Sequence, residues 1–310
     1  MTELFEARKK ELYYYSPYNF IRDFLEEKQL ENCILPAIHH LEIKKNSFII
    51  DIKCNGQEHQ FYVSNLEWDT SYFGINTYKL QFVLFSHHNI SILAQAIHLF
   101  LEKISKEGIY CFIEIPSEDI ILLQALTSAR FKLIETRMTY YRGALQHFSA
   151  DRFPVRKATE DDTQNLKRVA REMRNIYDRF HADPVFSQNI ADEFLATYIE
   201  QSIKGFSDII LTSNEKGIPS DSFLTANYLK NEWEKNGVKI SKMVLSAVSS
   251  KTNKGWYKKL ISEMTYHLRD EGAEYIFMNT QSTNRAVIHT WENLGYHYGA
   301  TSHILSFNNI

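Results

Sequence analysis

One segment near the end of the chain constrains the fold more than any other. Residues 243–248 (Met-Val-Leu-Ser-Ala-Val) form an apolar run, residues 249–255 are polar and end in a glycine, and helical spacing of apolar residues opens at Trp256. This pattern predicts a strand that feeds a helix through a short loop. The first amides of a helix have no helical acceptor and its dipole favours negative charge, so such a loop suits an anion. Lys251 and Lys254 add positive charge there, which favours a pyrophosphate ligand.

The loop matches neither of two common phosphate-binding motifs. Gly255 is followed by Trp256 and not by Lys-Ser/Thr, so the Walker pattern is absent. The paired glycines of a dinucleotide fold are absent too. Taken alone, the loop is therefore also compatible with an ordinary helix start. The next segments add information: an apolar strand pattern over residues 275–278, then Asn284, then a helix that closes on residues 291–296 (Trp-Glu-Asn-Leu-Gly-Tyr).

The order and spacing of these segments resemble the two cofactor motifs of the GNAT acyltransferase family. The family's loop motif reads Gln/Arg-x-x-Gly-x-Gly/Ala, and Thr252, Gly255 and Tyr257 stand at its three defined positions. Only the first glycine matches, so two of the three positions depart from the motif. The second motif is an asparagine followed by a helix that ends in Tyr-Glu-Lys-Leu-Gly-Phe. Asn284 and residues 291–296 match it well.

The first half of the chain repeats the pattern of the second half without its loop. In both halves a helix, a strand, a helix and a strand follow with nearly the same spacing, and strands alternate with helices throughout. We therefore expect an α/β fold (an α+β mixed sheet) built from two GNAT-like domains. Residues 1–148 would form a degenerate domain and residues 151–310 the catalytic one, the only one with a coenzyme A loop. Thr159 and Asp162 resemble a capping pattern for the first helix of the second domain.

Composition argues against several function classes. A net charge of -3 without a basic patch speaks against a nucleic-acid partner. No apolar run approaches the roughly 18 residues that a membrane span needs, and the polar, acidic start has no signal-peptide pattern. The three cysteines are odd in number and widely spaced, which fits neither a disulfide framework nor a zinc site. We expect a cytoplasmic protein with free thiols and no metal.

Two further segments, residues 66–75 and 178–186, resemble parts of the dTDP-fucosamine acetyltransferase group. That group acetylates a nucleotide-linked amino sugar and carries a truncated copy of the fold in front. The first segment is also compatible with a core aromatic and a turn, and the second with a solvated junction between a helix and a loop. The resemblance implies that His181 or Asp183 accepts a proton from the amine, His181 being favoured because its unperturbed pKa is near neutral. The residues expected to bind the acceptor are Asp178, Arg179 and Phe180.

The resemblance implies transfer of an acetyl group from acetyl-CoA to a primary amine by direct attack. The free edge of residues 244–248 would pair with the pantetheine arm, and a backbone N–H there would stabilise the oxyanion. Trp291 stands where the family often has a tyrosine, and an indole cannot deliver a proton at neutral pH. Either the thiolate leaves unassisted or another hydroxyl serves, while Trp291 could stack on a ligand. The residues expected to contact the coenzyme are Val244, Leu245, Ser246, Ala247, Val248, Thr252, Asn253, Lys254, Gly255, Trp256, Tyr257 and Asn284.

Three other functions stay open on the sequence alone. A transferase that takes aminoacyl groups from tRNA would want a basic face, which the net charge disfavours. A non-catalytic binding protein with a degenerate GNAT fold would explain the missing tyrosine and the imperfect loop. A third alternative acetylates a protein N-terminus or lysine instead of a small-molecule amine. The sequence leaves open the sugar, the acyl chain and the number of associated chains, a homodimer among them.

Overall fold

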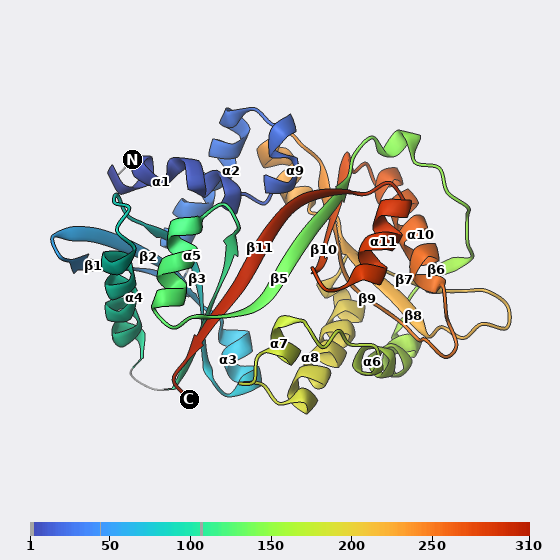
Figure 1. Cartoon of the computed structure of the whole chain (residues 1–310). Helices are drawn as coiled ribbons and strands as arrows, with labels where there is room; N and C mark the ends of the chain where they lie inside the picture. The colour runs from blue at the N-terminus through green and yellow to red at the C-terminus, as the bar shows by residue number, and fades with distance from the viewer. Residues whose placement is uncertain (1–2, 44, 106–107) are drawn as a thin grey trace. The chain divides into compact units, whose positions relative to one another are not determined.

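The computed structural model of the chain describes residues 3–43, 45–105 and 108–310 (Figure 1). The first two residues of the polar N-terminal stretch therefore lie outside the described part. The chain divides into two compact units, which we call the first unit (Met1–Arg137 with Ala300–Ile310) and the second unit (Met138–Gly299). This division falls before the predicted boundary at residues 148–151, because strand β5 (Lys132–Arg142) has residues in both units. The last strand, β11 (His297–Asn308), is divided in the same way.

The first unit opens with helices and continues with alternating strands and helices. Its sheet contains β1, β2, β3 and β4 in that order, followed by β11; β1, β2 and β3 pair antiparallel and β3 pairs parallel with β4. The elements that precede β5 are α1 (Glu3–Leu12), 3-10 turns at Tyr13–Tyr15 and Asn19–Phe24, α2 (Glu27–Ile43), β1 (Ser47–Cys54), β2 (Gln57–Asn65), α3 (Glu67–Phe73), β3 (Asn76–Leu84), α4 (Ile90–Ile104), β4 (Ile109–Pro116) and α5 (Ile120–Ser128).

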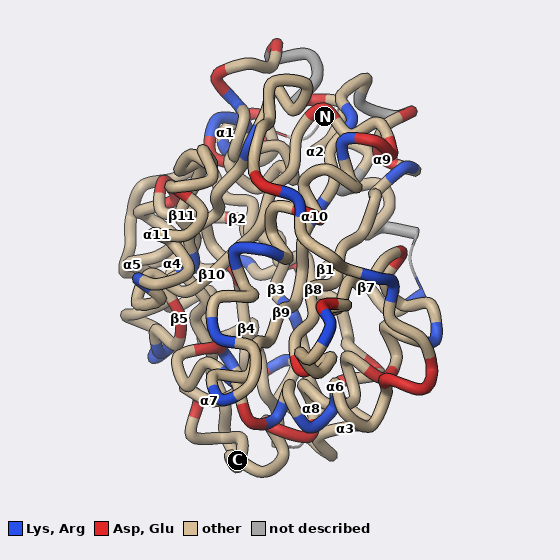
Figure 2. The backbone as a smooth tube through the Cα atoms, turned by 90° about the vertical axis from the view of Figure 1, so that its right-hand side faces the viewer, with Lys and Arg blue, Asp and Glu red and all other residues tan. Residues whose placement is uncertain are grey.

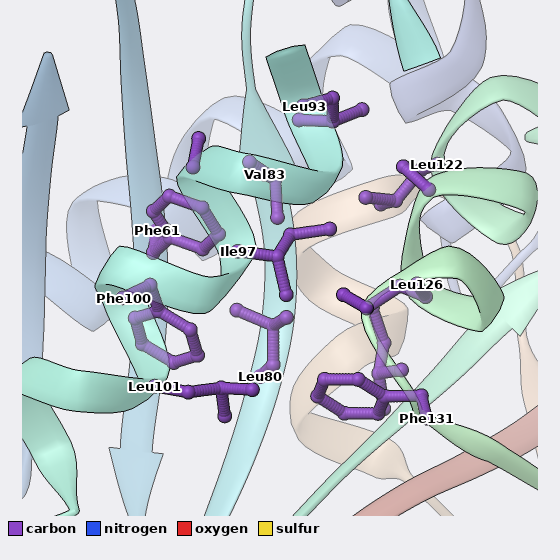
Figure 3. Close-up of a cluster of buried hydrophobic side chains, with 14 of the residues drawn as sticks. Phe61, Leu80, Val83, Leu93, Ile97, Phe100, Leu101, Leu122, Leu126 and Phe131 are labelled. Atoms are coloured by element: carbon purple, nitrogen blue, oxygen red, sulfur yellow. The ribbon is translucent and has the colours of Figure 1, made fainter. Parts of the chain in front are cut away.

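Helices α4 and α5 cover one face of the first unit's sheet and bury its main core (Figure 3). Helix α4 forms where apolar residues recur at helical spacing, and its N-cap Asn89 accepts a hydrogen bond from the amide of Ile92 at 3.1 Å. On its inner side Phe100 stacks on Phe61 of β2, with ring centroids 4.5 Å apart. Each large apolar side chain buried in this way contributes roughly 1.5–3 kcal/mol.

The second unit places an antiparallel meander beside a parallel strand pair. The strand order is β6, β7, β8, β9 and β10; the first four pair antiparallel and β9 pairs parallel with β10. The capping box predicted for Thr159 and Asp162 is confirmed. The helices and strands are β6 (Val155–Lys157), α6 (Thr163–Glu172), α7 (Arg179–Ala182), α8 (Gln188–Gln201), β7 (Ile209–Ser213), β8 (Ser222–Asn227), α9 (Lys230–Asn236), β9 (Ile240–Val248), α10 (Trp256–Asp270), β10 (Tyr275–Gln281) and α11 (Arg285–Asn293).

Helices bury apolar side chains against both faces of the second unit's sheet. One core lies under α10 and α11 and includes Met243 of β9. The other lies under α6 and α8 and includes Ala247 of the same strand. A strand buried on both faces reads as a continuous apolar run, which is why residues 243–248 show no polar alternation.

In both units the parallel strand pair separates before its strands end. Along the described residues, the β3–β4 register ends at Leu80 with Ile113, although both strands continue. The β9–β10 register ends at Lys242 with Phe277, and again both strands continue. We call the stretches beyond these pairs the first fork and the second fork. Because a strand edge without a partner exposes N–H and C=O groups, each fork offers backbone hydrogen bonds.

The part of the chain that the structure describes contains no helix long and apolar enough to cross a membrane. Figure 2 shows lysine and arginine scattered along the chain among aspartate and glutamate. All three cysteines are buried thiols outside any disulfide, as expected from the sequence.

Candidate coenzyme and acceptor site

A β-bulge shapes the strand edge at the second fork. Leu224 pairs with Ser246 and Ala226 with Met243, so two residues of β9 oppose one residue of β8. That residue is Thr225, whose hydroxyl accepts a hydrogen bond from the amide of Leu245 at 3.0 Å and donates to its carbonyl at 3.3 Å. Peptide groups in a strand point alternately to its two edges, so the amide of Ser246 faces the fork.

The polar loop after β9 is anchored by one buried asparagine. Asn253 is only 1% exposed, and its side-chain Nδ2 lies 2.9 Å from the Ser213 hydroxyl, 3.0 Å from the Pro219 carbonyl and 3.1 Å from the Ser222 hydroxyl. Its backbone amide donates to the carbonyl of Ser249 at 3.0 Å. The side chain therefore holds the loop against β7 and β8, and the loop conformation depends on it.

Gly255 ends the loop and is the N-cap of α10. Its φ of 87° lies in the left-handed region that favours glycine, and a side-chain carbon placed on it would meet no atom within 4 Å. Because no described side chain caps the helix, the first-turn amides that follow Trp256 are available to a ligand. Lys251 and Lys254 are exposed in the same loop. Trp256, by contrast, is 2% exposed and belongs to the core.

The hydroxyl of Thr252 is already hydrogen-bonded to a neighbouring carboxylate. Its hydroxyl donates to Asp221 at 2.8 Å, and Arg168 pairs with the same carboxylate at 2.9 Å. Burial opposes ionisation of Asp221, but hydrogen bonds from Asn165 and Thr252 and the nearby Arg168 charge hold its pKa below the ordinary value. Asp221 is thus neutralised by its partners beside the loop, and it does not leave an uncompensated negative charge where an anion is expected.

Tyr257 and Trp291 contact one another in the core under α10 and α11. Trp291 is 2% exposed, and its indole Nε1 donates to the hydroxyl of Tyr257 at 2.8 Å. Burial raises the pKa of the Tyr257 phenol well above its ordinary value. The indole predicted to act on a ligand is therefore buried with its N–H already bonded. The tyrosine predicted to contact the coenzyme is bonded through its hydroxyl to this indole, which the sequence did not indicate.

Asn284 lies between the end of β10 and the start of α11. It is the N-cap of α11, and its side-chain Nδ2 donates to the Thr280 hydroxyl at 3.0 Å. A second contact joins this region to the segment before α7, where the Asn175 amide donates to Gln281 Oε1 at 2.5 Å. The structure thus brings the loop between α6 and α7 to the carboxyl end of β10. Sequence spacing carried no signal for this contact.

His181 is held between two carboxylates. Its side chain is fully buried, with Nδ1 2.8 Å from Asp178 Oδ2 and Nε2 3.0 Å from Asp192 Oδ1. Burial alone would lower the pKa of His181, but its hydrogen bonds to Asp178 and Asp192, with the charges of those carboxylates, raise it above the ordinary value. A general base needs a free nitrogen lone pair near the amine. Both nitrogens of His181 are engaged, so this geometry suits a structural imidazolium.

The other residues predicted around the acceptor also have partners within the second unit. The Arg179 guanidinium lies 4.3 Å from the ring centre of Phe180, whose ring packs 4.1 Å from that of Phe194. Asp178 caps α7 by accepting from the amides of Phe180 and His181. Asp183 is 1% exposed and accepts from the amide of Val185 at 3.2 Å. These side chains build the α7 turn, and their roles toward an acceptor stay predictions.

The first fork is filled by the chain's own N-terminal segment. Arg8 of α1 pairs with Asp119, which directly precedes α5, and its guanidinium lies 4.2 Å from the ring centre of Phe85 after β3. The Tyr15 hydroxyl donates to the same Asp119 carboxylate at 2.7 Å. Arg8 is 3% exposed and Asp119 1%. The N-terminal segment therefore bridges the ends of β3 and β4. Of the two described helices that follow β3 and β9, α4 has Asn89 at its N-cap and α10 has a glycine.

No family model matches this chain, and no curated protein matches it. Solved structures do match. A GCN5-related N-acetyltransferase from Sphaerobacter thermophilus has a TM-score of 0.57 at 9% identity, covering 99% of this chain and 94% of that one. A functionally unknown conserved protein from Staphylococcus epidermidis has a TM-score of 0.53 at 12% identity, covering 87% and 98%. A GCN5-related glucosamine N-acetyltransferase region in a fungal multi-domain GH3 beta-N-acetylglucosaminidase has a TM-score of 0.53 at 11% identity, covering 97% of this chain and 37% of that one.

The chain therefore has the fold of the GCN5-related N-acetyltransferases, and the predicted α/β fold class is confirmed. At these identities the likeness shows the fold alone. Activity must be argued from the site.

Proposed function

We propose that this protein transfers an acetyl group from acetyl-CoA to a primary amine in the second unit. The observation that carries the proposal is the second fork next to the uncapped, glycine-headed start of α10. The first-turn amides of α10 would receive the pyrophosphate, with Lys251 and Lys254 adding charge. The free edge of β9 would pair with amides of the pantetheine arm.

The residues at the fork fit this coenzyme. At the bulge of β9, the hydroxyl of Thr225 accepts the hydrogen bond of the Leu245 amide, and the Ser246 amide is left facing the fork. A thioester oxygen bound there would develop negative charge during the reaction, which that amide would stabilise. The coenzyme would supply the activated acyl group. The coenzyme thiol needs no strong acid as it leaves, because a thiol pKa is only about 8.5. Trp291 and His181 then act by packing and by holding local structure.

The acceptor side favours a ligand with a flat or apolar face. Ile176 is 55% exposed and Tyr177 53%, directly after the Asn175 that contacts Gln281. Exposed aromatic and aliphatic groups beside a site offer stacking to a sugar ring or a base. A nucleotide-linked amino sugar has both, and one of the matched structures is a glucosamine N-acetyltransferase region, whose named substrate is an amino sugar. We therefore propose such an acceptor over a protein N-terminus or lysine.

A second candidate function is a binding protein without catalysis. One observation favours it: Tyr257 stands at the sequence position where the family motif has glycine or alanine, and its hydroxyl is bonded to the buried Trp291 indole. In that case the coenzyme would bind without turnover. Release of free thiol in the presence of amine separates the two functions.

Calorimetry of acetyl-CoA binding tests the proposal first. Gly255→Asp adds a side chain and a negative charge at the start of α10 and should weaken binding at least tenfold. The matched control is Gly237→Asp, since Gly237 also has a left-handed φ (65°) and open space around it but lies at the end of α9. Equal binding by both variants, or no binding by folded wild type, would overturn the coenzyme site. Thiol release with nucleotide-linked amino sugars, against peptide amines as the alternative, then tests the acceptor.

A further inference from the structure

Three side chains from neighbouring strands of the first unit form a hydrogen-bonded row outside the site described above. They belong to Ser117, directly after β4, to His303 of β11 and to Thr136 of β5. The strand order β4, β11, β5 brings them together. The Ser117 hydroxyl lies 3.0 Å from His303 Nε2, and the Thr136 hydroxyl lies 3.2 Å from His303 Nδ1. All three residues are partly exposed.

The register of β4 and β11 explains why the serine and the histidine meet. His303 pairs with Ile115, and the amide of Ser117 donates to the carbonyl of Thr301 at 3.1 Å, so the ladder continues to Ser117. Side chains two residues apart in a strand point to the same face, which makes Ser117 and His303 diagonal neighbours on that face. Ser117 also opens the short connection to α5, whose N-cap is Asp119.

This arrangement fits a nucleophile held beside its base. A serine hydroxyl becomes reactive when an adjacent imidazole can take its proton and a third group orients the ring. Burial lowers the pKa of His303, which favours the neutral ring. When Nδ1–H donates to the Thr136 hydroxyl, the lone pair of Nε2 faces Ser117. In the opposite tautomer Nε2 carries the proton, and the Ser117 hydroxyl donates to the Thr301 carbonyl at 3.1 Å instead.

We propose that Ser117 is a nucleophile that accepts acyl groups from small activated esters, with His303 as its base and Thr136 as a positioning residue. The site lies within the first unit and does not depend on the proposed coenzyme function. The Ser117 oxygen attacks the ester carbonyl carbon while its proton passes to His303 Nε2. The bond from that carbon to the leaving oxygen then breaks, and the leaving alcohol takes the proton from His303.

Water completes the cycle. It attacks the acyl-serine, gives a proton to His303, and releases the acyl group as a carboxylic acid while that proton returns to the Ser117 oxygen. The orienting group is a hydroxyl, whereas the Ser-His-Asp triad uses a carboxylate that stabilises the imidazolium. The row is therefore suited to esters with good leaving groups and not to amides.

Labelling with a fluorophosphonate tests the nucleophile, because this reagent forms a phosphorus–oxygen bond with a reactive serine and releases fluoride. Peptide mapping should place the label on Ser117, with Ser302 as the internal reference, a partly exposed serine bonded to a carboxylate. His303→Gln should slow the labelling at least tenfold, since a general base contributes about a hundredfold or more. His267→Gln is the matched control, because its Nε2 also lies 2.9 Å from a hydroxyl, that of Tyr228, in the second unit. Its labelling rate should equal that of wild type.

The positioning role of Thr136 has a separate test. Thr136→Val should slow labelling and Thr136→Ser should restore it, and hydrolysis of p-nitrophenyl acetate should change in the same order and be lost in Ser117→Ala. Heteronuclear NMR of the His303 ring should show an unprotonated Nε2. Ser117 labelled no faster than Ser302, an unchanged rate in folded His303→Gln, or a protonated Nε2 would overturn the proposal. Ser117→Ala should bind acetyl-CoA as wild type does, so these outcomes leave the proposed function standing.

Discussion

Arg8 and Asp119 form a buried ion pair between residues 111 positions apart, and this pair holds the N-terminal helix over the first fork. Arg8 Nε and Asp119 Oδ1 are buried without a hydrogen-bond partner among the described residues. The pair is thus incompletely compensated, and removing one partner leaves the other charge buried. Under α10 and α11 of the second unit, the Trp291 indole donates to the Tyr257 hydroxyl.

We expect Arg8→Met to destabilise the first unit by about 3–5 kcal/mol, because it leaves the Asp119 carboxylate buried with only Tyr15 as a partner. Urea unfolding measures this loss. Lys204→Met is the control, since the pair of Lys204 with Glu200 is exposed and should cost less than about 1 kcal/mol. The double variant Arg8→Met with Asp119→Leu should recover most of the stability. A loss below that of Lys204→Met would show that the buried pair does not hold the segment.

The pKa of His181, raised by its two carboxylate partners, makes the second unit less stable in alkali. A raised folded-state pKa contributes stability that is fully present below the unfolded pKa of about 6.5 and is lost as pH rises through the folded value. Hydrogen exchange of α7 and α8 should therefore accelerate from about pH 7 upward beyond its intrinsic pH dependence. His181→Gln should flatten this excess, and the exposed His289→Gln should not. Loss of turnover in a folded His181→Gln variant, with binding intact, would instead restore the catalytic role predicted from sequence.

The first unit should respond to pH in the opposite direction through His59 and His87. Their Nε2 atoms lie 2.8 Å apart, and the Asn89 amide donates to His87 Nδ1, so the shared proton belongs to His87. Burial lowers the pKa of both rings. The contribution of these two histidines to the stability of the first unit is therefore fully present above about pH 6.5, and it is lost as the pH falls through their lowered folded-state pKa values. Urea midpoints of the first unit at pH 7 and pH 5 measure the loss.

Replacement of one histidine of this pair tests the assignment. His87→Gln should reduce the difference between the two midpoints, because a glutamine gains no proton in this range. His98→Gln, on the exposed side of α4, is the control and should keep the wild-type difference. An unchanged difference in His87→Gln would assign the acid sensitivity to other groups.

Thr225→Val should destabilise the bulge of β9 by about 1–3 kcal/mol, because it removes the acceptor of the Leu245 amide. Thr212→Val is a matched control: Thr212 is also fully buried, but its hydroxyl only donates, to the Ser222 carbonyl at 2.7 Å. Urea unfolding should show a smaller loss for the control, and coenzyme binding should weaken only in Thr225→Val. Equal losses with equal binding would remove any special role for the bulge.

Local patterns in the sequence were sufficient to predict the strand, the turn and the helix that form the candidate site. The apolar run before the polar loop predicted β9, the helical spacing from Trp256 predicted α10, and Gly255 marks the left-handed turn between them. The capping box at Thr159 was equally readable. Such features depend on residues that lie within a few positions of one another, so they can be predicted from the local sequence.

The contacts that decide the chemistry join residues far apart in the chain, and only tertiary packing brings them together. Trp291 meets Tyr257 across 34 positions, and Arg8 meets Asp119 across 111. The sequence alone determined which strands and helices form and where the glycine turn lies, because backbone conformation follows from local side chains. The tertiary structure alone decided that a carboxylate from α8 engages His181, and that an ion pair bridges the first fork. Long-range hydrogen bonds depend on which helix faces pack together, and that information is absent from sequence spacing.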